Sequence, residues 1–285
     1  MPSVGRVLGL LAVLALAVVL PVQVGPYRAG PATVYHYPRL HYPRIHVKGQ
    51  GVTYDLNWAG YADVLPDYSI LSVNASWIVP NVTCGSKTTY VAVWVGIDGF
   101  NDNTVEQTGI QVQCSGGKAY YSAWYEFYPA APVSAPSSDV VKPGDKIVAW
   151  VVYNPSTNEY RTVLVDVTEG WNYTSPWTSV SGALDDSAEW VVERPAIGNS
   201  LTTLADFGTA YFNVYFTNIT PLGDFYLRLA NGSVGNISSF NYTAMIMVNN
   251  KGQILAQPSG LYAYGSSFYV CYGSCTTSSS SPHKK

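Results

Sequence analysis

The sequence predicts an all-β protein in which two antiparallel sheets stack into a sandwich within a single domain. From about residue 54 onward, short apolar or alternating stretches rich in Val, Ile, Thr, Tyr and Trp recur, as half-buried strands do. Clusters of Gly, Pro, Asn and Asp separate these stretches, and no convincing amphipathic helix interrupts them. With helix nearly absent, stacking two sheets is the natural way to bury this much apolar surface.

The expected strands follow one another at short intervals, and each is bounded by turn residues. In chain order they cover residues 72–79, 89–97, 109–114, 119–128, 146–153, 160–167, 188–192, 209–216, 243–248 and 267–271. Turn signals at residues 142–145, 231–232 and 249–252 favour hairpin connections between some of them. Sandwiches of this size commonly fold as one unit, so we expect one domain.

The chain divides into four segments. Residues 1–24 carry a charge at Arg6 and continue in a run of Leu, Val and Ala, which is typical of a secretory signal peptide. We therefore expect secretion, with an uncleaved membrane anchor as the alternative. Residues 25–53 form a basic segment rich in His, Pro and Tyr, residues 54–273 form the sandwich, and residues 274–285 form a Ser-rich tail.

The basic segment is interpreted as a pro-segment. It contains two copies of His-Tyr-Pro-Arg between His36 and His46, whose X-Pro steps favour extended backbone. Residues 1–50 carry five basic and no acidic residues, whereas the other 235 carry ten basic and eighteen acidic residues, a net charge of −8. This acidic body gives no reason to expect nucleic-acid binding, but it could attract the pro-segment as an inhibitor. A solvated linker is the alternative.

Acid would weaken such an inhibitory contact. The histidines of the pro-segment gain charge as the pH falls, but the carboxylates that face them become neutral, so their attraction is lost. We therefore expect any release of the pro-segment to be triggered by acid.

Four cysteines in an exported chain favour disulfide bonds. Three pairings are possible, and the positions favour Cys84 with Cys114 and Cys271 with Cys275. No metal site is expected, because the chain has no CxxC pair and the body has no histidine, and no cofactor is expected either. Sequons for N-glycosylation, which would suit a glycan-bearing surface, begin at Asn74, Asn81, Asn172, Asn218, Asn231, Asn236 and Asn241.

The chemistry available to the body is limited to carboxyl groups and amides. Without histidine, Ser-His and Cys-His catalysis and the usual zinc peptidases are excluded. Gln107 can accept from a water with its carbonyl and donate from its NH₂ to an oxyanion. Glu189, on a strand beside aromatic residues, could have its pKa raised into a range useful for acid–base work. Strand alternation places Glu189 and Glu193 on one face. Pattern alone also allows ordinary structural roles for Gln107 and Glu189.

At these residues the chain resembles the glutamic peptidase (eqolisin) family. The matching segments, in family order, are Asn57–Gly60, Trp94–Gly99, Gln107–Gly109, Ala123–Pro129, Ala188–Glu193 and Ala205–Thr209. Any one of these motifs would be weak, but six in the same order are highly specific. The resemblance implies a concanavalin-like jelly-roll sandwich with a cleft on a concave face.

The resemblance further implies a metal-independent acid endopeptidase that acts on unfolded or extended protein, and we expect it to be a monomer. Gln107 and Glu189 fall on the catalytic pair. In the implied mechanism this pair holds a water, Glu189 takes its proton as it attacks, Gln107 donates to the oxyanion, and Glu189 returns the proton to the leaving nitrogen. The positions that line or support the cleft, and so bind peptide substrates, correspond to Trp94, Asp98, Trp124 and Glu126.

Two positions depart from the family pattern, since Gln111 and Ser122 stand where the family often has aspartate. These neutral residues bear on the pH optimum and the subsite preference more than on the reaction. Two other functions stay open. One is a glycoside hydrolase or carbohydrate-binding sandwich that uses Glu126 and Glu189 as its carboxyl pair. The other is an inactive surface or adhesive module.

Overall fold

The computed structural model describes residues 33–42, 51–213 and 226–275, which all belong to one compact unit beginning at Thr33. Apart from one short 3-10 helix, η1 (Ile237–Ser239), their regular structure is strand, which confirms the all-β prediction. Every expected strand is present, although the one expected at 209–216 runs past the described residues. The signal-peptide prediction and all but the first two residues of the predicted tail lie outside the described part.

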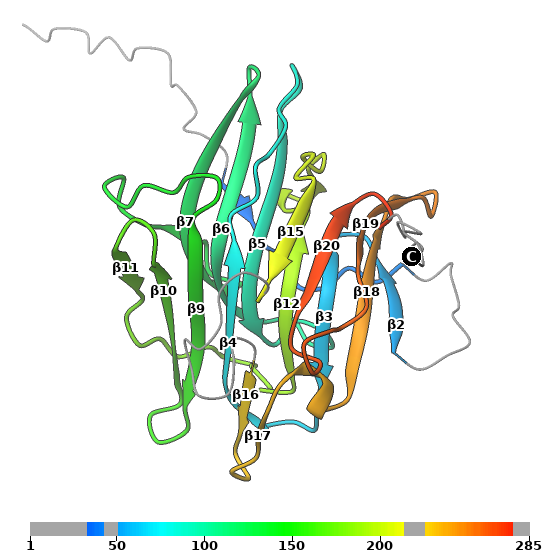
Figure 1. The fold of residues 1–285 in the computed structure, drawn as a ribbon. Helices are drawn as coiled ribbons and strands as arrows, with labels where there is room; N and C mark the ends of the chain where they lie inside the picture. Colours follow the sequence, from blue (N-terminus) through cyan, green and yellow to red (C-terminus); the bar gives the residue numbers. More distant parts are fainter. Residues whose placement is uncertain (1–32, 43–50, 214–225, 276–285) are drawn as a thin grey trace, which may run out of the picture. The chain divides into compact units, whose positions relative to one another are not determined.

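One layer of the sandwich carries the sequence motifs (Figure 1). Its strands, in spatial order, are β8 (Val133–Ser134), β7 (Lys118–Tyr128), β6 (Val105–Ser115), β5 (Thr89–Ile97), β12 (Ser187–Glu193), β3 (Trp58–Val64) and β18 (Tyr242–Val248). All these neighbours are antiparallel, and β2 (Val52–Asp55) adds a parallel pairing to β18. The motif residues are therefore brought side by side by pairings between strands that are distant in sequence.

The second layer packs against the first. In spatial order it contains β11 (Trp171–Thr174), β10 (Glu159–Asp166), β9 (Lys146–Asn154), β4 (Ile70–Ile78), β15 (Thr209–Phe212), β20 (Phe268–Tyr272) and β19 (Ile254–Pro258). A short hairpin of β16 (Tyr226–Leu229) and β17 (Val234–Gly235) also pairs with β4. Because β18 pairs with β19, the two layers are continuous along one edge.

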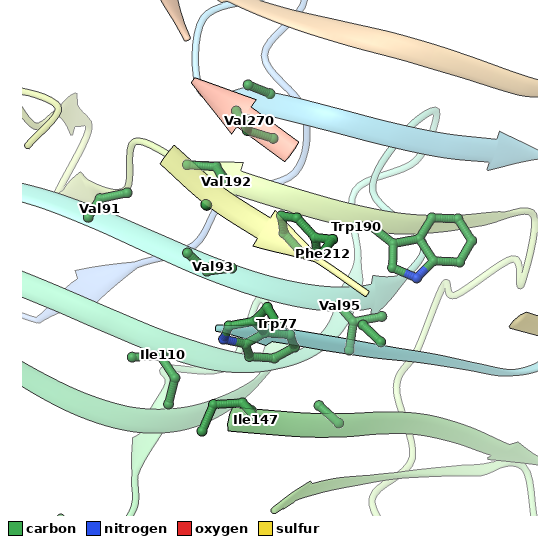
Figure 2. Close-up of a cluster of buried hydrophobic side chains, with 14 of the residues drawn as sticks. Trp77, Val91, Val93, Val95, Ile110, Ile147, Trp190, Val192, Phe212 and Val270 are labelled. Atoms are coloured by element: carbon green, nitrogen blue, oxygen red, sulfur yellow. The ribbon is translucent and has the colours of Figure 1, made fainter. Parts of the chain in front are cut away.

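The main hydrophobic core lies between the layers (Figure 2). Trp77 and Phe212 of the second layer meet Val93 and Trp190 of the first, and all four side chains are buried. Successive side chains on a strand point to opposite faces. The other face of β5, β6 and β12 therefore points away from this core, and it carries the aromatic and polar residues of the motifs.

Both expected disulfide bonds are present, Cys84 with Cys114 and Cys271 with Cys275. One sequon expectation is wrong, because Asn74 is completely buried on β4 and its side-chain oxygen accepts a hydrogen bond from the Tyr226 backbone. Among the described residues, no helix has the length and apolar character needed to cross a membrane.

Candidate active site

The outward face of β5, β6 and β7 gathers most of the predicted site residues. Register places Gln107 opposite Glu126, and Trp94 opposite Gly109, which is in turn opposite Trp124. Residues paired across neighbouring antiparallel strands lie on the same face of a sheet. Gln107, Glu126, Trp94 and Trp124 therefore share one face, where Trp94 and Trp124 belong to a second buried apolar cluster, separate from the main core.

Two motif glycines make room for the Trp94 side chain. A Cβ atom on Gly109 would lie 2.5 Å from Cβ of Trp94, and one on Gly96 would lie 2.9 Å from Cζ3 of the same indole. Both distances are shorter than real contacts allow, so the indole lies over the two glycines. This requirement explains why the Trp-Val-Gly and Gln-Thr-Gly motifs each end in glycine.

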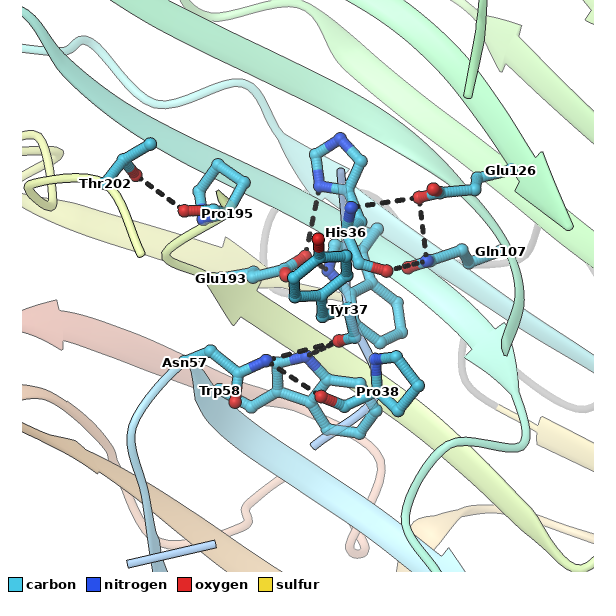
Figure 3. Close-up of polar contacts among 11 residues, drawn as sticks. His36, Tyr37, Pro38, Asn57, Trp58, Gln107, Glu126, Glu193, Pro195 and Thr202 are labelled. Carbon is cyan, nitrogen blue, oxygen red and sulfur yellow. Dashed lines mark hydrogen bonds and ion pairs between the residues drawn. The ribbon is translucent and has the colours of Figure 1, made fainter. Parts of the chain in front are cut away.

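Residues 33–42 lie across this face, and we refer to them as the cleft segment. The strand β1 (Val34–Tyr35) begins it by pairing with β13 (Ala196–Ile197), which also pairs with β14 (Ser200–Leu201). His36 then donates its backbone N–H to Oε2 of Glu126 at 3.0 Å, and Nε2 of Gln107 donates to the His36 carbonyl at 2.8 Å (Figure 3).

The cleft segment is held further along by side chains of β3 and its approach. The indole of Trp58 donates to the Tyr37 carbonyl at 3.1 Å, and Asn57 donates to the carbonyls of Tyr37 and Pro38. Arg39 donates to Oδ1 of Asp55 at 3.1 Å. Most of these hydrogen bonds are made to backbone carbonyl groups of the cleft segment, as expected for a site that binds an extended chain.

Glu193 also contacts the cleft segment, as Glu126 does. Its Oε2 accepts from Nε1 of Trp94 at 2.8 Å and lies 3.1 Å from Nδ1 of His36. The Tyr37 backbone N–H also donates to this carboxyl group. Gln107 therefore faces the carbonyl of the His36–Tyr37 peptide bond while Glu193 faces its nitrogen, and the two lie on either side of the segment in Figure 3.

The predicted pairing of Gln107 with Glu189 does not match this geometry. Gly96 stands between these two residues in the strand register, and the Trp94 ring lies over Gly96. Both carboxyl oxygens of Glu189 are buried, and neither bonds to Gln107. Both glutamates belong to one motif and alternate in phase, so the sequence does not show which of them contacts the cleft segment; in the structure it is Glu193.

Glu189 belongs instead to a buried acidic group at one end of β5 and β12. Its pKa is raised well above the usual range, chiefly by burial and then by Asp98, Asp102 and Asp186, while Ser187 opposes the rise. Asp98, predicted to line the cleft, accepts hydrogen bonds from the backbone N–H groups of residues 184–186. Asp98 therefore organises the loop that leads into β12, and within the described residues it makes no hydrogen bond to the cleft segment.

One group of described residues has the spacing for a metal ion, since carboxyl oxygens of Asp98, Asp102 and Asp186 lie within 4.8 Å of one another. However, Asp98 already accepts three backbone N–H groups, and Asp102 accepts the Gly99 N–H and the Thr104 hydroxyl. These hydrogen bonds to the loops explain why the carboxyl groups lie close together.

Burial controls the electrostatics of the cleft. It raises the pKa of Glu193 well above the usual range, Glu126 adds to the rise, and hydrogen bonds from Trp94 and the Tyr37 backbone oppose it. Burial likewise raises the pKa of Glu126, against the hydrogen bond from His36. Oε1 of Gln107 and Oε1 of Glu193 are buried and accept no hydrogen bond from the described residues. These two oxygens are free to accept the hydrogens of a water.

A β-sandwich whose cleft face holds a peptide backbone between a glutamine and a glutamate fits the glutamic peptidases that the six sequence motifs resemble. The chain belongs to the Peptidase A4 family, which matches residues 56–220. All six sequence motifs fall within this range. The family assignment favours a peptidase over the glycoside hydrolase and the inactive module.

Relatives and solved structures agree with this assignment. The chain is 32% identical to Aspergillopepsin-2 of Aspergillus niger over 182 residues, which cover 56% of this chain and 63% of the relative, less than two thirds of its length. Scytalido-glutamic peptidase with a transition state analog inhibitor has the same fold, with a TM-score of 0.62 and 22% identity over 76% of this chain and 98% of that one. For aspergilloglutamic peptidase from Aspergillus niger the TM-score is 0.52, with 29% identity over 65% of this chain and 99% of that one.

Proposed function

We propose that the chain is an exported acid endopeptidase that hydrolyses peptide bonds with Gln107, Glu193 and a water molecule. One observation carries the proposal: the His36–Tyr37 peptide bond has Gln107 on its carbonyl oxygen and Glu193 on its nitrogen. These are the two atoms that gain charge or a proton when an amide is hydrolysed. Export is supported by the two disulfide bonds and by the signal-like start of the sequence.

In the proposed reaction, a water donates its two hydrogens to Oε1 of Gln107 and to Glu193 as a carboxylate. Glu193 takes one proton while the water oxygen bonds to the carbonyl carbon, and Nε2 of Gln107 stabilises the oxyanion. Glu193 then passes the proton to the leaving nitrogen, so the C–N bond breaks and the carboxylate is restored. Glu126 orients Gln107, because its Oε2 lies 3.3 Å from Nε2 of that amide.

The raised pKa of Glu193 suits the last step, because in that step the protonated carboxyl group gives its proton to the leaving nitrogen. The first step needs the carboxylate. Burial is the largest cause of the shift, so the pKa of Glu193 should fall when the cleft segment leaves and water enters. The cleft segment would thus exclude other substrates by occupying the substrate position.

Three variants test the proposal in an acid digestion of an unfolded protein followed by mass spectrometry of the products. Gln107→Ala and Glu193→Gln should each lower kcat by about 10²-fold or more, the loss typical of a removed oxyanion donor or proton carrier. Glu189→Gln is the matched control, because it is equally buried on the same strand and face. It should retain most of the activity.

A different ranking would change the conclusion. Full loss in Glu189→Gln with activity kept in Glu193→Gln would restore the pairing expected from sequence. If purified wild type cleaves glycan but not protein, and Gln107→Ala still cleaves it, the chain is a glycoside hydrolase. No cleavage of either polymer under acid conditions would indicate the inactive module.

A further inference from the structure

The side chain of His36 occupies a pocket of its own beside the proposed catalytic pair. It is 1% exposed, and its ring stacks on the Trp124 indole with centroids 3.6 Å apart and planes 5° from parallel. Its Nδ1 lies 3.1 Å from Oε2 of Glu193, and the side chain of Gln111 also hydrogen-bonds to the imidazole. The pocket therefore provides a flat aromatic wall and two polar groups placed for the ring nitrogens.

Gln111 reaches this pocket because of the strand register. Gln111 pairs with Ser122, one step along the same face from the pair of Gly109 with Trp124. Gly109 has no side chain, so the Trp124 indole and the Gln111 amide are not separated by a bulky neighbour. The two positions at which the sequence departs from the family pattern thus lie opposite each other, next to the pair of Gly109 with Trp124.

A purely aromatic side chain could use only part of this pocket. Phenylalanine would stack on Trp124, but it would lose the hydrogen bonds that the imidazole makes to Gln111 and Glu193. Sites built to bond a polar group discriminate strongly against analogues that lack it. An aliphatic side chain would lose the stacking as well.

Building on the proposed function, we infer that this pocket selects histidine on the carbonyl side of the cleaved bond and that Gln111 is the specificity-determining residue. The His36–Tyr37 bond is then the chain's own first cleavage site. Water adds its oxygen to the His36 carbonyl carbon, the C–N bond breaks, and the nitrogen takes a proton. The products are a segment ending at His36 and a chain beginning at Tyr37.

The specificity is tested with peptides that copy residues 33–42 and carry His, Phe, Gln or Leu at the position of His36. For the wild-type protein, kcat/KM for the His peptide should exceed that for the Phe peptide by about tenfold or more. Gln111→Met keeps the length of the side chain but removes its amide, and it should lower this His-to-Phe ratio by about tenfold. Gln111→Glu is the matched control, because it keeps an acceptor oxygen and should preserve the ratio.

The cleavage site is tested by acid incubation of the full chain, with the first new N-terminus identified by mass spectrometry. Tyr37 is expected, and a first cut elsewhere would overturn the assignment. Equal cleavage of the His and Phe peptides, or a ratio unchanged in Gln111→Met, would overturn the pocket's selectivity while leaving the peptidase intact. Failure of wild type to cleave any peptide or unfolded protein would instead overturn the proposed function.

Discussion

Acid should weaken the contribution that one side chain, His36, makes to the docking of the cleft segment. Burial lowers the pKa of the docked His36 from 6.5 to about 3, with the Gln111 hydrogen bond opposing the shift. Docking therefore favours the neutral ring. The contribution of His36 to the free energy of docking is fully present above pH 6.5 and is lost as the pH falls from 6.5 toward about 3.

The size of the effect follows from the shift. The pKa of the undocked imidazole is 6.5, so at pH 4.5, two units lower, that ring is protonated, whereas the docked ring is still neutral. Each pH unit corresponds to about 1.4 kcal/mol, so docking should be weaker by about 2.7 kcal/mol, or about 100-fold, than at pH 7.5.

Other titrating groups face the same ring and must be separated from it. Docking raises the pKa of Glu193 and of Glu126 through burial, and contributions of this sign are present in acid and lost as the pH rises. The pH dependence of these two contributions is therefore opposite to that of the His36 contribution. A His36→Gln variant keeps them while removing the imidazole, so the difference between the two proteins isolates the His36 contribution.

Hydrogen exchange of the backbone amides of residues 36–42 provides the assay, with both proteins carrying Gln107→Ala to prevent self-cleavage. Between pH 7.5 and pH 4.5, the docking constant of the His36 protein should fall about 100-fold relative to that of the His36→Gln protein. Parallel pH profiles for the two proteins would refute the reasoning, because they would show that the docked imidazole is protonated as readily as the free one.

Three further changes test other parts of the structure. Arg39→Met should weaken docking of the cleft segment by about 1.5–3 kcal/mol, measured by the same amide exchange, because Asp55 loses its charged partner. Burial raises the pKa of Asp63 to about 8, so the contribution of Asp63 to stability is present in acid and lost as the pH rises through about 8. In urea unfolding, Asp63→Asn should therefore reduce the fall of the free energy of unfolding with rising pH. The same pH dependence in both proteins would contradict the assignment. Gly109→Ala should lower the free energy of unfolding by several kcal/mol because its Cβ would lie 2.3 Å from a backbone carbonyl, whereas Gly85→Ala, which meets nothing within 4 Å, should change it by less than about 1 kcal/mol.

Local patterns predicted the sandwich well. Strands such as β5 and β9 alternate or run apolar over their whole length and end at turn residues, so periodicity located them. Strand β3 is absent from the expectations, because its Trp-Ala-Gly-Tyr-Ala stretch contains little β-branched character. Its position between β12 and β18 buries it on both sides, and that tertiary environment makes it a strand.

The cleft segment shows the limit of local reasoning. The basic charge of residues 25–53 suggested an ionic clamp, with a solvated linker as the alternative. In the structure, Arg39 does pair with Asp55, but most contacts of residues 33–42 are made by their backbone and by the inserted ring of His36. Such contacts depend on where distant strands place Gln107 and Glu126, which net charge does not report.

The sequence by itself determined the all-β class, the favoured disulfide partners, the peptidase family and the shared face of Glu189 and Glu193, because strand period and ordered motifs are local properties. Only the tertiary structure decided which glutamate faces the cleft. Glu189 and Glu193 are in phase on one strand, so no periodicity separates them. The direction of the Trp94 indole distinguishes the two glutamates. Its Nε1 donates a hydrogen bond to Glu193, while its ring covers Gly96, which lies between Glu189 and Gln107.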